Sequence, residues 1–414
     1  MRKIVLHGTS MVGSQWGNHS RTTLFAMALA AAVAQASQAQ TATPPAAPAP
    51  ASLAKPAITR ADLGDAYLRM DKAYVAATLT DSARAAINKQ FDRSTLSFFG
   101  GRFAAAIATI DSATVAVSGK PLVPVAPRPS RLVNGRVPSM ARDAFLKRLA
   151  KLDTAGPLAQ AITSARARAA LLVDEPSRER LAEWLSEPPQ LARDLAREVS
   201  VLEKGRNPYV GQAGDAWHMF KGDKGVLIPM RIAAPAAAAT SSAPVPVLIA
   251  LHGAGGDENM FMEAYGQGLA KTMGLAANVI VVTPLTDTFG TNPAHFDSLM
   301  VVLRAAYRVN TARVYVMGHS MGAGAAARLA QTRPKSIAAV ACLAGGSVVT
   351  APDAPPMMFI GAELDPIIPA ARVKQAAEGS KAATYMQLQH EGHTLMVANA
   401  IRIALPWLLE HRPQ

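Results

Sequence analysis

The pentapeptide Gly318-His319-Ser320-Met321-Gly322 constrains the fold of this chain more than any other segment. The apolar run 314–317 precedes it and the small-residue run 323–330 follows it, which predicts a strand that turns sharply into a helix. Glycines on both sides of Ser320 remove Cβ atoms from the turn and lift the serine hydroxyl clear of a sheet. A glycine-rich turn without chemistry fits the same pattern, but the flanking strand and helix favour an exposed, reactive serine.

A serine hydroxyl is a weak nucleophile at neutral pH and needs a base, normally a histidine held by a carboxylate. Both residue types follow Ser320 in the chain, each in a loop after a predicted strand. Asp365 follows the run 357–360, and His393 follows the run 385–388. Loops at the carboxyl ends of parallel strands are where such sheets place active-site groups. Asp365 and His393 are therefore the candidate acid and base.

Each of these two assignments has a competitor. Glu363 lies closer to its strand and lacks the proline turn that follows Asp365, and His390 lies at the end of the preceding strand. Gly392 gives His393 the freedom to reach inward, so we favour Asp365 and His393. A metal site built on His390 and His393 is disfavoured, because the sequence shows no clear set of further ligands.

The negative charge that develops during acyl transfer needs preorganised N–H donors. Residues 251–256, Leu-His-Gly-Ala-Gly-Gly, end a predicted strand in a small-residue loop whose backbone can approach a reacting oxygen. Met321 is expected to supply one backbone N–H, and Ala254 or Gly255 the other. A nucleotide phosphate loop is the alternative, but this segment lacks the Lys-Ser/Thr ending and the G-x-G-x-x-G spacing.

After residue 206, short apolar runs alternate with helical segments, as in a parallel sheet covered on both faces. The fold class predicted for residues 206–414 is therefore α/β, with a doubly wound, mostly parallel sheet. Residues 216–220 and 226–232 predict a hairpin at its start, and 233–246 predict a loop. The further predicted strands are 247–251, 279–282, 314–317, 337–343, 357–360 and 385–388.

Residues 59–205 predict an all-helical domain. Leu63, Tyr67, Met70 and Tyr74 recur at helical spacing, and similar patterns follow at 96–110, 145–152, 181–185 and 191–202. No catalytic constellation stands out in this half of the chain. We therefore expect a structural or substrate-gating role for it.

The first residues predict a secretory signal over 1–39, because basic residues precede the apolar run 24–34 and small residues follow it. Residues 40–58 are rich in proline and alanine and predict an extended tether. No run reaches the roughly 20 apolar residues that cross a bilayer. We therefore expect export to the periplasm or beyond the cell, without a membrane span.

The formal net charge is +13, yet no basic run is interleaved with aromatic residues, so a nucleic-acid partner is not expected. The single cysteine, Cys342, lies inside the apolar run 337–343 and predicts a buried, structural thiol.

Residues from about 216 to 410 resemble α/β-hydrolases, particularly secreted esterases and polyhydroxybutyrate-depolymerase-like or feruloyl-esterase-like serine hydrolases. The resemblance rests on segments 251–256 and 318–322, with Asp365 and His393 following in family order. It implies hydrolysis of a small or oligomeric ester through an acyl-enzyme on Ser320, without a metal or an organic cofactor. Many relatives insert a cap before the strand that carries the acid, but 345–356 is too short for one. A lid would therefore come from the helical domain.

Three other functions fit parts of the same pattern. A prolyl-oligopeptidase-like peptidase uses the same triad, and an acyltransferase shares the acyl-enzyme. A binding protein on a hydrolase fold is disfavoured, because it has no physical need for all three groups. Aromatic residues make up only 5% of the chain, which favours soluble esters over a polymer surface. The sequence predicts neither the acyl group nor an oligomeric state.

Overall fold

The computed structural model describes residues 58–122, 132–174, 188–240 and 243–412. The predicted signal, nearly all of the predicted tether and the helical stretch at 181–185 lie outside these residues. Among the described helices, none combines the length and the apolar character needed to cross a membrane.

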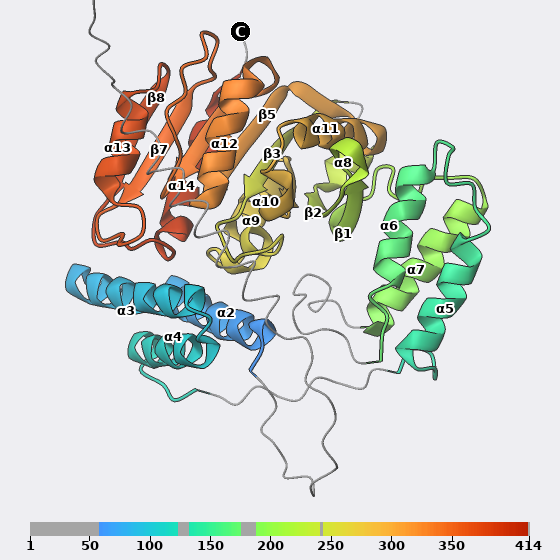
Figure 1. The fold of residues 1–414 in the computed structure, drawn as a ribbon, viewed down its shortest axis with the longest axis horizontal. Helices are drawn as coiled ribbons and strands as arrows, with labels where there is room; N and C mark the ends of the chain where they lie inside the picture. The colour runs from blue at the N-terminus through green and yellow to red at the C-terminus, as the bar shows by residue number, and fades with distance from the viewer. Residues whose placement is uncertain (1–57, 123–131, 175–187, 241–242, 413–414) are drawn as a thin grey trace, which may run out of the picture. The chain divides into compact units, whose positions relative to one another are not determined.

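An eight-stranded sheet forms the centre of the second half of the chain, in the order β1-β2-β4-β3-β5-β6-β7-β8 (Figure 1). Strands β1 and β2 form the predicted hairpin, β2 also pairs antiparallel with β4, and the remaining pairs are parallel. The prediction of a mostly parallel sheet is therefore confirmed. The strands are β1 (Gly214–Lys221), β2 (Leu227–Ala234), β3 (Val245–Leu251), β4 (Ile280–Pro284), β5 (Val309–His319), β6 (Ala339–Leu343), β7 (Met357–Ala362) and β8 (Ala383–Leu388).

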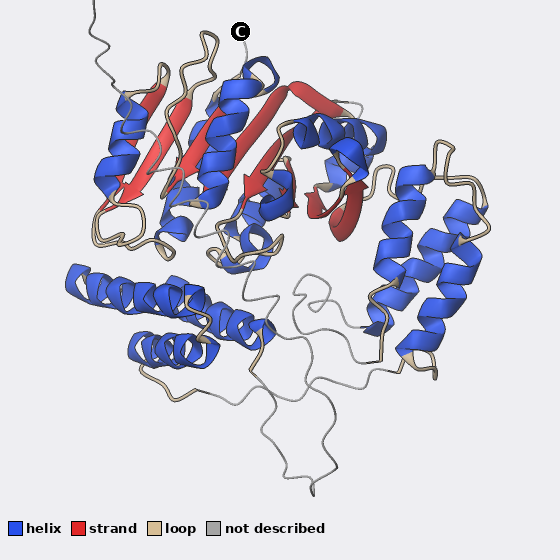
Figure 2. Ribbon diagram, in the orientation of Figure 1, coloured by secondary structure: helices blue, strands red, loops and turns tan. Residues whose placement is uncertain are grey.

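Helices cover both faces of this sheet (Figure 2). Buried residues of α11, α12 and α13 pack on one face, and buried residues of α9 and α14 pack on the other. Strands β3, β4, β6 and β7 are buried along their whole length, and β5 is buried in its second half, as expected for parallel strands between two helical layers. These helices are α9 (Leu269–Ala276), α10 (Thr286–Phe289), α11 (Ala294–Ala306), α12 (Met321–Thr332), α13 (Ala370–Glu378) and α14 (Met396–Glu410).

The predicted loop at 233–246 is partly wrong. Strand β2 continues to Ala234, and the alanine-rich stretch after it forms α8 (Ala236–Thr240). Alanine has the highest intrinsic helix propensity, which explains the extra turn. Cys342 on β6 is buried, as predicted.

The described helices of the first half form two groups with separate hydrophobic cores. The first consists of α2 (Arg60–Ala76), α3 (Asp81–Phe99) and α4 (Phe103–Ser118), and the second of α5 (Pro138–Leu149), α6 (Ala159–Ala169) and α7 (Pro188–Glu203). The second group contacts β1, where Arg168 donates a 2.6 Å hydrogen bond to the carbonyl of Trp217. The core of the first group includes Leu395, which lies directly before α14.

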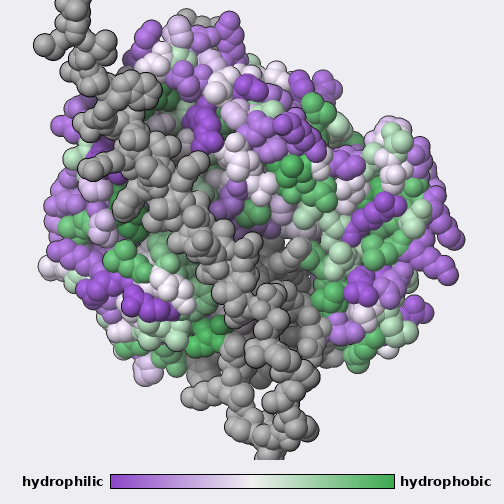
Figure 3. Space-filling view, viewed as in Figure 1, coloured by the Kyte–Doolittle hydropathy of each residue, from purple (hydrophilic) through white to green (hydrophobic). Residues whose placement is uncertain are grey.

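Exposed apolar side chains occur on several elements. Leu96 on α3, Met140 on α5 and Val301 on α11 are each more than half exposed. Hydrophobic and hydrophilic residues are interspersed on the face drawn in Figure 3. Isolated exposed apolar residues of this kind are normal on a protein surface.

The burial of two leucines predicts how much stability the protein loses when each is changed to alanine. Leu195 on α7 is fully buried, so Leu195→Ala is expected to lower the free energy of unfolding by about 2–5 kcal/mol. Leu96 on α3 is 53% exposed, so Leu96→Ala is the matched control, with an expected change below about 1 kcal/mol. Urea denaturation followed by circular dichroism measures both, and equal losses would contradict the observed burial.

Candidate active site

Ser320 lies in the tight turn between β5 and α12, where the sequence predicted it. Its φ is 55° and its ψ is −114°, a combination that residues with a side chain rarely adopt. Its backbone N–H donates a 2.8 Å hydrogen bond to the carbonyl of Leu343 at the end of β6. The strained turn is therefore anchored to the neighbouring strand.

The glycines on both sides of Ser320 are required by close backbone contacts. A Cβ atom at Gly318 would overlap the carbonyl of Gly322, and one at Gly322 would overlap the carbonyl of Leu251 on β3. Neither neighbour is a flexible side chain that could move away. The pattern of glycines is therefore a direct consequence of how tightly β5, α12 and β3 meet.

The structure brings Ser320, His393 and Asp365 into one hydrogen-bonded chain. The Nε2 atom of His393 lies 2.9 Å from the Oγ atom of Ser320, and its Nδ1 atom lies 2.7 Å from Oδ2 of Asp365. With the proton on Nδ1, the ring donates to the carboxylate and accepts from the serine hydroxyl. The other carboxylate oxygen of Asp365 accepts hydrogen bonds from the backbone N–H groups of Ile367 and Ile368, at 2.8 and 2.9 Å.

The two competitors lie elsewhere. Glu363 accepts a 2.7 Å hydrogen bond from the backbone N–H of His390. The ring of His390 is 3.6 Å from both Glu363 and Asp81, and the side chain is 38% exposed. No hydrogen bond in the described part of the chain links either residue to Ser320.

The predicted donor loop lies beside Ser320. Ala254 and Gly255 line the same cavity as Ser320. Within the described residues, the backbone N–H groups of Ala254, Gly255 and Met321 donate to no other residue, so they are free to receive a ligand oxygen. Arg60 on α2 donates hydrogen bonds to the carbonyls of Gly255 and Gly256, at 2.6 and 2.9 Å. The loop is therefore held from the helical half of the chain.

His319 and Tyr265 form a second, buried contact that the sequence did not indicate. Nε2 of His319 lies 2.9 Å from the backbone carbonyl of His393, and its Nδ1 lies 2.8 Å from the hydroxyl of Tyr265. Burial lowers the pKa of His319 well below its ordinary value, so its ring is neutral. A neutral ring donates through Nε2 to the carbonyl and accepts from the tyrosine, which supports the His393 backbone.

Helix α3 holds the other side of the loop that carries His393. Oδ1 of Asn88 accepts a 2.8 Å hydrogen bond from the N–H of Gly392, and Oδ2 of Asp92 accepts a 3.0 Å bond from the N–H of His393. A Cβ atom at Gly392 would overlap the Asp92 carboxylate. Gly392 is therefore needed for this close approach of the loop to α3.

The carboxylate of Asp92 is buried and only partly satisfied. It is 3% exposed, and its Oδ1 atom has no hydrogen-bond partner among the described residues. Loss of solvation is the main cause that raises the pKa of Asp92 from 3.8 to about 6, and the hydrogen bond from His393 opposes it. This carboxylate therefore costs folding energy in its ionised form.

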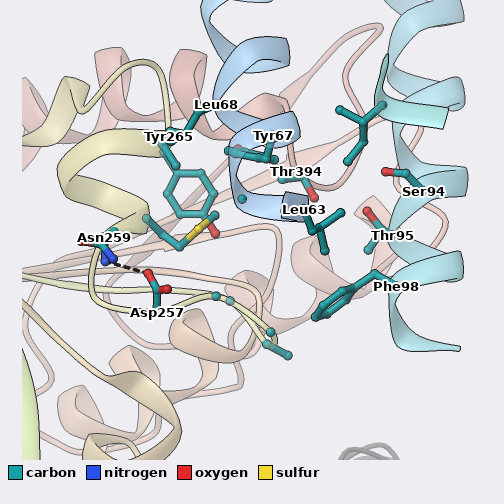
Figure 4. Close-up of a pocket in the computed structure, with 18 of the residues that line it drawn as sticks. Leu63, Tyr67, Leu68, Ser94, Thr95, Phe98, Asp257, Asn259, Tyr265 and Thr394 are labelled. Carbon is teal, nitrogen blue, oxygen red and sulfur yellow. Dashed lines mark hydrogen bonds between the residues drawn. The ribbon is translucent and has the colours of Figure 1, made fainter. Parts of the chain in front are cut away.

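A cavity of about 170 Å³ opens beside Ser320 and His393 (Figure 4). The helical group α2–α4 provides one wall, as the missing cap insertion led us to expect. Most of the side chains in that wall are apolar, and they come from all three helices. They are Leu63, Tyr67, Leu68, Phe91, Phe98, Phe99 and Ile110.

The strand order, the antiparallel β2 and the turn at Ser320 together define the α/β-hydrolase fold. No family model matches the chain, and no curated protein matches it.

Solved structures with a similar fold include three hydrolases. A thermostable esterase is 22% identical, with 48% of this chain and 63% of that chain covered and a TM-score of 0.39. An S-formylglutathione hydrolase from Agrobacterium tumefaciens is 12% identical (49% and 97% covered, TM-score 0.39). The feruloyl esterase module from Clostridium thermocellum is 15% identical (50% and 92% covered, TM-score 0.41). This chain thus spans just under two thirds of the thermostable esterase, and the fold assignment rests on its own strand order.

The raised pKa of the Asp92 carboxylate should make the stability of the protein depend on pH, and Asp92→Asn should remove that dependence. The folded-state pKa of about 6 lies above the ordinary value of 3.8, so this group's contribution is present below pH 3.8 and is lost as the pH rises through 6. The difference of about 2 between these two pKa values corresponds to about 3 kcal/mol of unfolding free energy. When the pH is raised from about 4 to about 7, the unfolding free energy of Asp92→Asn should therefore rise by up to that amount relative to that of wild type. Urea denaturation at both pH values measures the gain, and a pH-independent difference would contradict the assignment.

Proposed function

We propose that this chain is a serine hydrolase that cleaves carboxylic esters through an acyl-enzyme. The observation that carries the proposal is the hydrogen-bonded chain from Ser320 through His393 to Asp365. Such a chain has a specific chemical use, because it couples a weak nucleophile to a base whose other nitrogen is already held by a carboxylate. The strained turn at Ser320 supports it further, since strain is kept where the surrounding structure enforces it.

In the proposed reaction, Nε2 of His393 takes the proton from Ser320 as its oxygen attacks the ester carbonyl. The carbonyl oxygen becomes an oxyanion, and the backbone N–H groups of Met321 and of Ala254 or Gly255 stabilise it. Collapse of this intermediate releases the alcohol, which takes the proton from His393. Water then attacks the acyl-enzyme, again with His393 as base, and releases the carboxylic acid and the free serine.

Asp365 has a separate role in this mechanism. Its two backbone hydrogen bonds, from Ile367 and Ile368, hold the carboxylate in place. The fixed carboxylate selects the His393 tautomer that accepts from Ser320, and it stabilises the imidazolium formed during attack.

The cavity walls support an ester with an apolar acyl group as the substrate. Leu63, Phe91 and Phe98 face a small volume closed on one side by helices, which suits a soluble ester rather than a polymer surface. Figure 4 shows Leu63, Tyr67 and Phe98 directed into this space. We also propose that the protein is exported, on the basis of the signal pattern in residues 1–39.

The first test is loss of the nucleophile. Ser320→Ala is expected to lower kcat for p-nitrophenyl butyrate by about 10⁴-fold or more, because the acyl-enzyme cannot form. His393→Ala should cause a loss of the same order. Ser336→Ala changes an exposed serine of a short 3₁₀ turn and is the matched control. Full activity in Ser320→Ala would rule out the proposed mechanism. Product analysis with added alcohols or with peptide substrates separates an esterase from an acyltransferase or a peptidase.

The second test concerns the acyl pocket. Phe98 packs against Gly255 and lines the cavity, so Phe98→Ala is expected to enlarge it. The preferred p-nitrophenyl ester should then move to a longer acyl chain, measured as kcat/KM over a series of chain lengths. Phe103 stacks on Phe98 with ring centroids 5.9 Å apart but does not line the cavity, so Phe103→Ala is the control. The same chain-length profile in all three proteins would contradict an acyl site at this wall.

A further inference from the structure

Two residues one turn apart on α3 accept hydrogen bonds from consecutive backbone N–H groups of the His393 loop. Asn88 binds the N–H of Gly392, and Asp92 binds the N–H of His393, at 2.8 and 3.0 Å. Positions four apart on a helix share one face, so α3 presents both acceptors to the loop together. These bonds join residues 304 and 301 positions apart in the chain.

The orientation of Asn88 is set by its neighbours. Its Nδ2 atom donates to the hydroxyl of Tyr74 at 2.9 Å, which leaves Oδ1 to accept from Gly392. The Tyr74 hydroxyl in turn donates to the buried carboxylate of Glu391 at 3.0 Å, and Arg84 donates to the same carboxylate at 3.0 Å. Helices α2 and α3 are therefore linked to this loop by a connected polar network rather than by one isolated bond.

Packing between α3 and the loop does not explain why a carboxylate occupies position 92. One of its oxygens has no partner among the described residues, and the side chain is almost fully buried. A buried carboxylate with an unpaired oxygen is costly, whereas a small apolar residue would avoid that cost. The polar contacts that this carboxylate makes and an apolar residue would not are with the backbone of the loop, foremost the hydrogen bond from the His393 N–H, with a weaker interaction at Thr394.

We propose that Asp92 is a positioning residue that fixes the backbone of His393 so that its imidazole stays between Ser320 and Asp365. This inference rests on the proposed function, and it makes α2–α4 a required part of the active site. Asp92 contacts the His393 N–H, while His319 contacts the His393 carbonyl. With both backbone groups held, the ring has little freedom to leave the line from serine to carboxylate.

The test compares Asp92→Ala and Asp92→Asn with wild type. Asp92→Ala is expected to lower kcat for p-nitrophenyl butyrate by about 10- to 100-fold, with KM within about threefold, because the substrate pocket is intact. In Asp92→Asn the amide oxygen still accepts from the His393 N–H, so kcat should recover to within about threefold of wild type. Hydrogen exchange of the peptide covering residues 389–395 should be faster in Asp92→Ala than in either other protein.

Asp71→Ala is the matched control. Asp71 is also a buried carboxylate, on α2, and it accepts hydrogen bonds from the backbone N–H groups of Gly266 and Gln267, in a different loop. If the carboxylates only attach the helices, both alanine variants should lose stability and kcat alike, and that result would overturn the proposal. A kcat for Asp92→Ala within twofold of wild type would also overturn it.

Two further outcomes remain decisive. If Asp92→Ala does not fold, Asn88→Ala removes the adjacent bond to Gly392 and is expected to lower kcat and speed exchange in the same peptide. If wild type hydrolyses no ester, the proposed function fails, and hydrogen exchange alone then shows whether Asp92 holds the loop. Unchanged exchange in the alanine variants would overturn the positioning role whatever the activity of wild type.

Discussion

The backbone contacts around the Ser320 turn are the constraint on which the rest of the site depends. Gly318 and Gly322 leave no space for a Cβ atom, because α12 starts against the carbonyl end of β3. This contact holds Ser320 at positive φ and places it beside the 251–256 loop. The cost of that conformation is offset by the packed sheet, in which β3, β4, β6 and β7 are buried along their whole length. The same sheet positions Asp365 and His393, which follow β7 and β8, so that His393 lies within hydrogen-bond reach of both Ser320 and Asp365.

Helices of the first half of the chain hold two of the loops that form the candidate site. Arg60 holds the carbonyls of the loop that carries the candidate oxyanion donors, while Asn88 and Asp92 hold the loop that carries His393. The same helices supply the apolar wall of the cavity. The contacts to both loops and the apolar wall of the cavity thus come from one structural unit, α2–α4. Helices α5–α7 have their own core and contact β1 instead. None of their described residues lines the cavity beside Ser320.

The sequence predicted those parts of the site that depend on local order along the chain. Ser320, Asp365 and His393 each follow a strand of a parallel sheet, so their convergence at one edge could be expected from strand pattern alone. The contacts of Asn88 and Asp92 could not, because they join a helix to a loop about 300 residues later and leave no periodic signal. The contact between His319 and His393 could not be predicted for another reason. His319 occupies a variable position of the G-x-S-x-G pattern, and only the fold shows that it contacts His393.

The measurement that tests the central claim most directly is covalent labelling with a fluorophosphonate, mapped by peptide mass spectrometry. The account predicts one phosphonylated residue, Ser320, because among the described serines only its Oγ atom is hydrogen-bonded to a histidine that is held by a carboxylate. It further predicts slower labelling in His393→Ala and none in Ser320→Ala. A folded wild-type protein that is not labelled, or is labelled at another serine, would contradict it.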